Sequence, residues 1–149
     1  MTDTLKVPFN DLRPKVAAHR SSIDRALARV LDRGWFILGP EVEAFEKELA
    51  AAMGVKDAVS VANGTDALIL ALEARGIGPG DEVITSPMSA AFSALAISRL
   101  GATPVFGDVD PVTMNLDPAT IERHITPKTR GILPIHLYGH PADLDPIME

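Results

Sequence analysis

The chain contains no cysteine, few aromatic residues and no cluster of basic residues. Without cysteine, a disulfide framework and a thiolate metal site are both excluded. Lysine and arginine number 14 against 20 aspartates and glutamates, which gives a formal net charge of −6. A chain with this balance is not expected to bind nucleic acid or an anionic membrane surface.

Long hydrophobic runs are absent as well. No apolar stretch reaches the length of a membrane span, and the segment from Met1 to Pro8 has no apolar region of the kind found in secretory signals. Hydrophobic residues nevertheless make up 46% of the 149 residues, which is enough for a packed core. These observations predict a cytoplasmic α/β protein without membrane partners.

The most informative stretch runs from residue 59 to residue 68. Its two valines, Val59 and Val61, are β-branched and predict a short strand. Asn63-Gly64 follows, a pair typical of turns. The apolar run from Ala67 to Leu72 then predicts a buried helix.

A helix that begins directly after such a turn exposes backbone N–H groups at the positive end of its dipole. Thr65 or Asp66 is expected to cap this helix. Asn63, Gly64 and Thr65 are therefore predicted to bind an anion, and a phosphate fits best. A glycine turn before a helix is also an ordinary feature of α/β proteins, and the stretch lacks both the G-x-x-x-x-G-K-[ST] and the G-x-G-x-x-G pattern. The neighbouring sequence has to decide between these interpretations.

Helices and strands are predicted to alternate along the chain. Pro14 and Gly34 delimit a first amphipathic helix, and Pro40 and Gly54 delimit a second. Ser89 is expected to cap a later helix that ends at Gly101. Further strands are predicted at residues 82–86, 103–106 and 131–136. The alternation predicts a mostly parallel sheet flanked by helices, with ligands bound at the carboxyl ends of its strands.

Between the first two helices lies the apolar loop Trp35-Phe36-Ile37-Leu38. An exposed apolar segment of this kind marks an interface, whereas a buried one is an ordinary connector. The sequence leaves both interpretations open.

Several motifs occur in an order that resembles one enzyme family. They are Gly34-Trp35-Phe36-Ile37-Leu38-Gly39-Pro40, Asn63-Gly64-Thr65-Asp66-Ala67-Leu68, Gly76-Ile77-Gly78-Pro79-Gly80-Asp81 and His136-Leu137-Tyr138-Gly139-His140-Pro141-Ala142-Asp143. Together they resemble the DegT/DnrJ/StrS family of pyridoxal-phosphate (PLP) aminotransferases, which act on nucleotide-linked keto-sugars. The resemblance covers nearly the whole chain from Val7.

The resemblance implies the fold type I aminotransferase architecture, an α/β large domain with a mostly parallel sheet. Residues 1–149 would be the N-terminal part of that PLP-binding domain, truncated on its C-terminal side and without the small C-terminal domain. Gly64 and Thr65 match the positions that hold the PLP phosphate. The column for a ring stacked on the cofactor falls at Ala90, and the nearest aromatic residue is Phe92, so the stacking residue stays open. The family also implies a homodimer, with Trp35-Phe36-Ile37 at its interface.

PLP transamination needs a lysine for the Schiff base and a carboxylate beside the pyridine nitrogen. In the family both lie beyond the matching segment, and none of the five lysines here stands in a matching setting: Lys6, Lys15, Lys47, Lys56 and Lys128. The chain alone is therefore predicted to be inactive and to bind PLP weakly or not at all. The parent enzyme is expected to move an amino group from glutamate to a nucleotide-linked keto-sugar, and a dehydratase variant of the family stays open.

Two other functions are compatible with parts of the sequence. A non-catalytic module that binds phosphate, cofactor or a partner would keep the glycine turn without the chemistry. A metal site at His136 and His140 is disfavoured, because Tyr138-Gly139 between them interrupts a helix and no third ligand is evident. The two histidines are instead expected to line the sugar or cofactor pocket.

Overall fold

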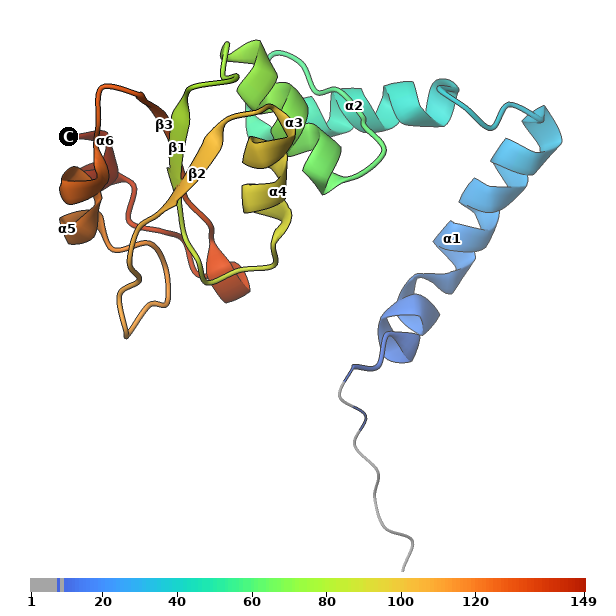
Figure 1. The fold of residues 1–149 in the computed structure, drawn as a ribbon. Coiled ribbons are helices and arrows are strands. Elements are labelled where there is room, and N and C mark those ends of the chain that lie inside the picture. Colours follow the sequence, from blue (N-terminus) through green and yellow to red (C-terminus); the bar gives the residue numbers. More distant parts are fainter. Residues whose placement is uncertain (1–7, 9) are drawn as a thin grey trace, which may run out of the picture. The chain divides into compact units, whose positions relative to one another are not determined.

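The computed structural model describes residue 8 and residues 10–149 (Figure 1). Residues 1–7, most of the segment predicted to lack a signal sequence, lie outside the described residues, as does residue 9. The chain divides into two compact units, Met1–Ser60 and Val61–Glu149.

In the first unit, two helices follow the predicted boundaries. α1 (Arg13–Arg33) and α2 (Pro40–Met53) each carry a proline in the first turn, where its missing N–H leaves no bond unmade. Gly34 and Gly54 end them in the left-handed conformation, with φ of 68° and 66°, and their N–H groups donate back to the last helical turn. The predicted proline starts and glycine stops are confirmed.

The apolar stripe predicted on α1 is not buried. The stripe consists of Val16, Ile23, Leu27, Val30 and Leu31. Val30 is half-buried, and the other four residues are between 39% and 66% exposed. α1 contains no buried residue, and in α2 only Ala50 is buried. Periodicity thus predicted the helices correctly but did not predict what covers them.

In the second unit, three parallel strands form the sheet. β1 (Glu82–Thr85) lies between β2 (Thr103–Phe106) and β3 (Thr129–Leu133). Thr85, the last residue of β1, is aligned with Phe106 and with Leu133, so the three carboxyl ends meet at one edge. The predicted parallel sheet is confirmed, although β3 ends before Pro134, which has no N–H for the ladder.

Helices cover both faces of this sheet (Figure 1). α3 (Gly64–Ala74) and α4 (Phe92–Arg99) lie on one face. The short α5 (Pro118–Ile121) and α6 (Asp145–Met148) lie on the other, and two 3₁₀ turns complete the unit, η1 (Glu122–His124) and η2 (Leu137–Gly139).

The core of the second unit has two halves, one on each face of β1. Val83 packs in a cluster with Ile77, Ile97 and Ala102, whereas its neighbour Ile84 packs in a cluster with Leu116 and Ile121. Successive strand residues point to opposite faces, so a strand of four residues serves both halves.

Three local expectations were wrong. Residues 59–61 form no strand, because no segment among the described residues pairs with them and a strand needs a neighbour for its backbone hydrogen bonds. Asn63, rather than Thr65 or Asp66, caps α3. Ser89 does not cap α4, which begins at Phe92 after Ala91.

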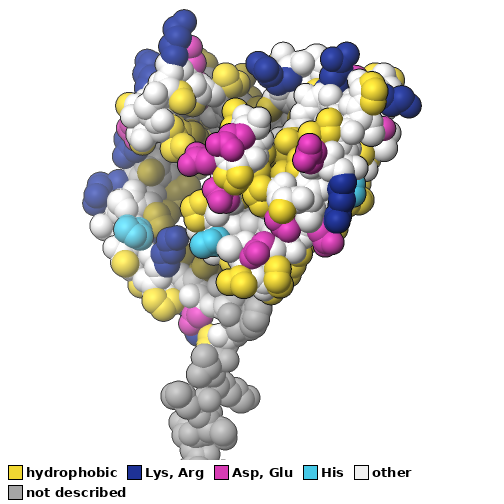
Figure 2. All heavy atoms as spheres, turned by 90° about the vertical axis from the view of Figure 1, so that its left-hand side faces the viewer, with side chains coloured by type: hydrophobic (Ala, Val, Ile, Leu, Met, Phe, Trp, Pro, Cys, Tyr) yellow, Lys and Arg dark blue, Asp and Glu magenta, His cyan; other side chains and the backbone are white. Residues whose placement is uncertain are grey.

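Acidic side chains gather on one face of the second unit. Figure 2 looks onto the side where α5 and α6 lie, and Asp and Glu side chains cluster in its middle. A face of this charge offers little attraction to a polyanion. Among the described helices, none has both the length and the apolar character needed to cross a membrane.

Candidate anion-binding site

The start of α3 leaves backbone donors free. Asn63 adopts an extended conformation, and its Oδ1 accepts a hydrogen bond from the Asp66 N–H at 3.0 Å. The Asn63 carbonyl accepts from the Ala67 N–H at 3.1 Å. Within the described part of the chain, no group accepts a hydrogen bond from the N–H of Gly64 or of Thr65. Both N–H groups stand at the positive end of the α3 dipole and remain available to a ligand.

These donors face a cavity of about 550 Å³ within the second unit, a size typical of small-ligand sites. Eight residues line it: Asn63, Gly64, Thr65, Leu68, Ser89, Ala90, Phe92 and Ser93. The structure therefore brings together all five residues that the sequence nominated for the cofactor. It also adds Ser89, from a segment that the sequence places at the carboxyl end of a strand, and Ser93, which sequence reasoning missed.

The cavity combines a polar end with an apolar wall. Thr65 is half-buried and carries a hydroxyl beside the free N–H groups. Phe92 is 57% exposed and lies with Leu68 among the apolar lining residues. Ala90 adds only a methyl group to the lining. A ligand with an anionic group and a flat apolar body fits such a site.

The two histidines do not line this cavity. Nδ1 of His136 accepts a hydrogen bond from the Ala142 N–H at 2.9 Å, which leaves Nε2 to carry the proton in the neutral ring. His140 lines a second cavity of about 700 Å³ together with Asp110, Asp117 and other residues of the loops after β2 and β3. The sequence placed the histidines at the carboxyl end of a strand, and the structure places them in the loop that follows β3.

Asn115 holds that loop in place. Its side chain is 3% exposed, and its Nδ2 donates to the carbonyls of His140 and Pro141 at 3.0 and 3.1 Å. Its Oδ1 accepts from the Leu137 N–H at 3.0 Å. One buried amide thereby joins the loop after β2 to the loop after β3.

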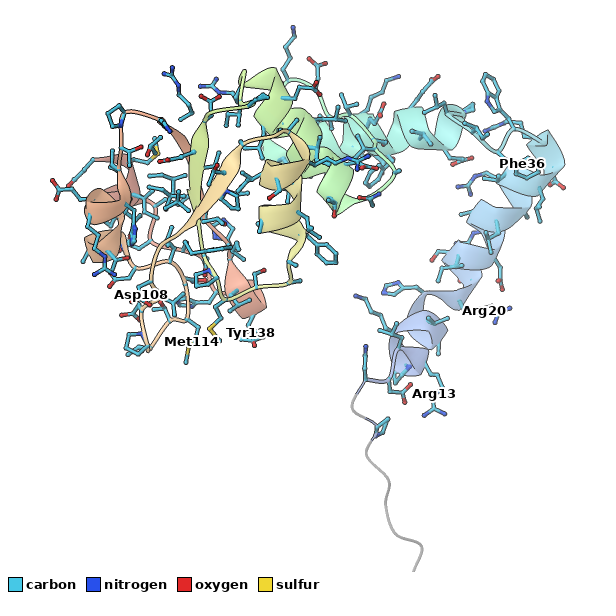
Figure 3. All side chains as sticks on the ribbon, in the orientation of Figure 1. Arg13, Arg20, Phe36, Asp108, Met114 and Tyr138 are labelled. Atoms are coloured by element: carbon cyan, nitrogen blue, oxygen red, sulfur yellow. The ribbon has the colours of Figure 1, made fainter. Side chains whose placement is uncertain are left out.

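Both loops contain a residue in the left-handed region. Met114 has φ of 60° and Tyr138 has φ of 55°, values that cost a non-glycine residue some energy. Figure 3 labels both residues, together with Asp108, beyond the carboxyl ends of the strands. The bonds of Asn115 offset this strain by fixing the backbone on either side.

The Asp110 carboxylate, in the loop after β2, is already engaged. Backbone N–H groups of Thr113 and Val112 hydrogen-bond to Asp110 and hold the pKa of its carboxyl below the usual value. Among residues 8 and 10–149, no cluster of three or more histidine, aspartate or glutamate side chains is arranged to hold a metal ion.

A cavity that combines free N–H donors with residues of the loop after β1 is the arrangement that α/β domains use at the carboxyl ends of parallel strands. A model of the DegT/DnrJ/EryC1/StrS aminotransferase family matches residues 18–149. The chain belongs to this family, which is PLP-dependent.

Individual relatives agree over most of the chain. The dTDP-3-amino-3,4,6-trideoxy-alpha-D-glucose transaminase of Streptomyces venezuelae is 50% identical over 147 residues, which are 99% of this chain and 39% of the relative. The crystal structure of DesV from S. venezuelae in complex with a ketimine intermediate matches with a TM-score of 0.93 and 50% identity, over 97% of this chain and 39% of that one.

NtdA from Bacillus subtilis, solved with its bound cofactor PMP, matches with a TM-score of 0.90 and 38% identity, over 95% of this chain and 33% of that one. The predicted family, the α/β aminotransferase fold and PLP as the family's cofactor are confirmed. The chain spans about 39% of the length of the S. venezuelae transaminase that it matches.

Proposed function

We propose that residues 1–149 are the N-terminal part of the PLP-binding large domain of an aminotransferase. The reaction is the transfer of an amino group from an amino acid, with glutamate as the donor, to a nucleotide-linked keto-sugar. One observation carries the proposal: the free N–H groups of Gly64 and Thr65 open into a cavity that also has an apolar wall. Membership of the family supports it.

PLP fits the chemistry of this cavity. The N–H groups of Gly64 and Thr65 and the Thr65 hydroxyl are donors for the phosphate, and Asn63 fixes the turn that presents them. Phe92 offers a ring to the flat pyridine, while Ala90 leaves space beside it. When bound, PLP supplies the electron sink that amino transfer requires.

The covalent attachment of PLP is not assigned to a lysine of this chain. The described lysines, Lys15, Lys47, Lys56 and Lys128, are all exposed, and none of them lines the cavity at the start of α3. We therefore propose that these 149 residues bind PLP only weakly, through its phosphate, and do not carry out transamination alone.

The loop after β3 is assigned to the substrate. His136 and His140 lie in this loop, away from the phosphate donors, and Asn115 gives the loop a fixed conformation. A preorganised loop at the carboxyl edge of a parallel sheet suits the recognition of a polar sugar.

The apolar loop between α1 and α2 is assigned to a homodimer interface. Trp35, Phe36, Ile37 and Leu38 are between 56% and 78% exposed, and Figure 3 labels Phe36 at this turn. The Trp35 Nε1–H donates to the Ile37 carbonyl at 2.6 Å, which holds the loop in one shape. A rigid exposed apolar surface favours association with a second copy of the chain.

The assignment of the phosphate site is tested by titrating the purified chain with PLP and with pyridoxal, which lacks the phosphate. We expect PLP to shift the amide resonances of Gly64 and Thr65 and pyridoxal to leave them unchanged. Thr65→Val removes the hydroxyl at constant shape and should raise the Kd for PLP about tenfold, since a hydrogen bond to a charged group contributes about 1.5–3 kcal/mol. Thr65→Ser should retain most of the affinity.

The matched control is Thr103→Val, at an exposed position on β2, which should bind PLP as the wild type does. Equal shifts by PLP and pyridoxal would contradict a phosphate site. Borohydride reduction should trap no adduct at a single lysine, and a stable adduct at one of the five would overturn the proposed absence of the attachment residue.

A further inference from the structure

We infer that the start of α4 forms a second arm of the same anion site, with Ser93 as its side-chain donor. The inference rests on the proposed phosphate site. In this arrangement one phosphate is held from two helices, by Gly64 and Thr65 of α3 and by Phe92 and Ser93 of α4.

The first observation is the Ser93 hydroxyl. Ser93 is 8% exposed and lines the same cavity as Gly64 and Thr65. Among the described residues, no hydrogen bond of the Ser93 Oγ is found, and this oxygen is not one of the fully buried atoms that lack a partner, so it is accessible from the cavity side. A hydroxyl without a protein partner, on a nine-tenths buried residue that lines a cavity, is a donor available to a ligand.

The second observation is the backbone at the start of α4. Its N-cap is Ala91, which has no side-chain oxygen, so no side chain caps the helix. The Ala91 carbonyl accepts from the Leu95 N–H at 2.9 Å, and among the described residues no acceptor pairs with the N–H of Phe92 or Ser93. These donors point out of the N-terminal end of an eight-residue helix.

The third observation is that α3 and α4 pack together and open on one cavity. Leu72 of α3 and Ile97 of α4 belong to the same apolar cluster, which fixes the two helices relative to each other. Residues from both helix starts, Gly64 and Thr65 on one side and Phe92 and Ser93 on the other, line the cavity. The positive ends of two helix dipoles therefore act on the same space.

No acidic side chain opposes an anion there. None of the eight lining residues is charged. The carboxylate nearest in sequence, Asp66, accepts a hydrogen bond from Asn63 Nδ2 at 2.8 Å and lines a different cavity. A phosphate dianion with three acceptor oxygens can use donors from both helices, whereas a carboxylate has only two oxygens for them.

The experiment is a titration of the chain with inorganic phosphate at constant ionic strength, followed by amide resonances. We expect the amides of Gly64, Thr65, Phe92 and Ser93 to shift together with one Kd. Ser93→Ala should raise this Kd about tenfold, as expected for a lost hydrogen bond to a charged group. Ser93→Thr keeps the hydroxyl and should restore the affinity to within about twofold.

Ser98→Ala is the matched control, because Ser98 lies in the same helix, is exposed and does not line the cavity. It should leave the Kd unchanged. Shifts at Gly64 and Thr65 without shifts at Phe92 and Ser93 in the wild-type chain would overturn the second arm and leave the proposed phosphate site standing. If none of the four amide resonances shifted, both the second arm and the proposed phosphate site would be overturned. The wild-type titration decides even if Ser93→Ala fails to fold.

Discussion

Apolar side chains are buried in the second unit of the molecule but largely exposed in the first. In the second unit, Val83, Ile84 and Ile97 are completely buried between the sheet and its helices. In the first unit, the apolar stripe of α1 remains exposed, with Leu27 at 57% and Leu31 at 66%. The same kind of sequence pattern therefore produces a closed core in one unit and an open surface in the other.

The two units differ because helix ends are encoded by nearby residues, whereas a buried core requires contacts between distant segments. Proline and glycine positions set the ends of α1 and α2 without any help from packing. The second unit needs β1 to pair with strands that follow it by about 20 and 50 residues in the chain before its core exists. Burial in the first unit requires a partner surface, and we have assigned one such surface to a second copy of the chain.

The largest effect should come from deleting core volume in the second unit. Ile84→Ala removes a fully buried side chain and should lower the free energy of unfolding by about 2–5 kcal/mol. Leu27→Ala, at an exposed position of α1, should change it by no more than about 0.5 kcal/mol. Urea unfolding at low protein concentration measures both, and equal costs would show that the α1 stripe is covered in solution.

An intermediate effect is expected from Asn115. Asn115→Ala leaves the carbonyls of His140 and Pro141 and the Leu137 N–H without their partner and should cost about 2–3 kcal/mol. Because the bonds join two loops outside the core, amide exchange should accelerate at Leu137 far more than at Ile84. Asn10→Asp, at an exposed site in the first unit, should alter neither amide.

If amide exchange at Leu137 and Ile84 accelerated equally in Asn115→Ala, the loop would unfold together with the core rather than separately from it.

The smallest effect concerns acid and the first unit. A hydrogen bond from Arg29, with a further contribution from Arg33, holds the pKa of Glu41 below its ordinary value of 4.5. The stabilisation is present above the unfolded pKa and is lost as the pH falls through the lower folded pKa. Helical content followed by circular dichroism from pH 6 downwards should show this loss.

Glu41→Gln should abolish this component of the acid transition, whereas Glu43→Gln on the same helix should retain it. Since Glu41 and both arginines are partly or largely exposed, added salt should also weaken the transition. If added salt left the acid transition unchanged, the transition would belong to a titrating group other than Glu41.

Sequence reasoning predicted the parallel α/β fold and the free N–H groups at the start of α3 because both leave short-range signals in the sequence. Gly34, Gly54 and the alternation of strands and helices are readable locally, and Asn63-Gly64-Thr65 marks a helix start in the sequence itself. The strand expected at Val59 and Val61 failed because β-propensity describes how a residue fits beside a neighbouring strand, and none of the described strands pairs there.

Other features depend on contacts between distant segments. Asn115 bonds to residues 22–26 positions later, which no local pattern indicates. Ser93 sits in an apolar helix and reads as a small core residue, although its place two residues after the cap of α4 is a signal that would have nominated it. The histidines were placed correctly at a strand end but not in the anion cavity, because only the folded loops separate the two cavities.

The pair Asn63-Gly64 also makes the purified protein prone to deamidation at Asn63 during storage. Asparagine followed by glycine deamidates readily, because glycine leaves the next backbone nitrogen unhindered for attack on the side-chain amide. The attack releases ammonia and forms a cyclic imide, and water opens the imide to aspartate or isoaspartate. Either product lacks the Nδ2 donor and places a negative charge beside Asp66. Stored samples should therefore lose phosphate affinity before they lose the α3 helix, and mass spectrometry of the peptide around residue 63 would follow the conversion.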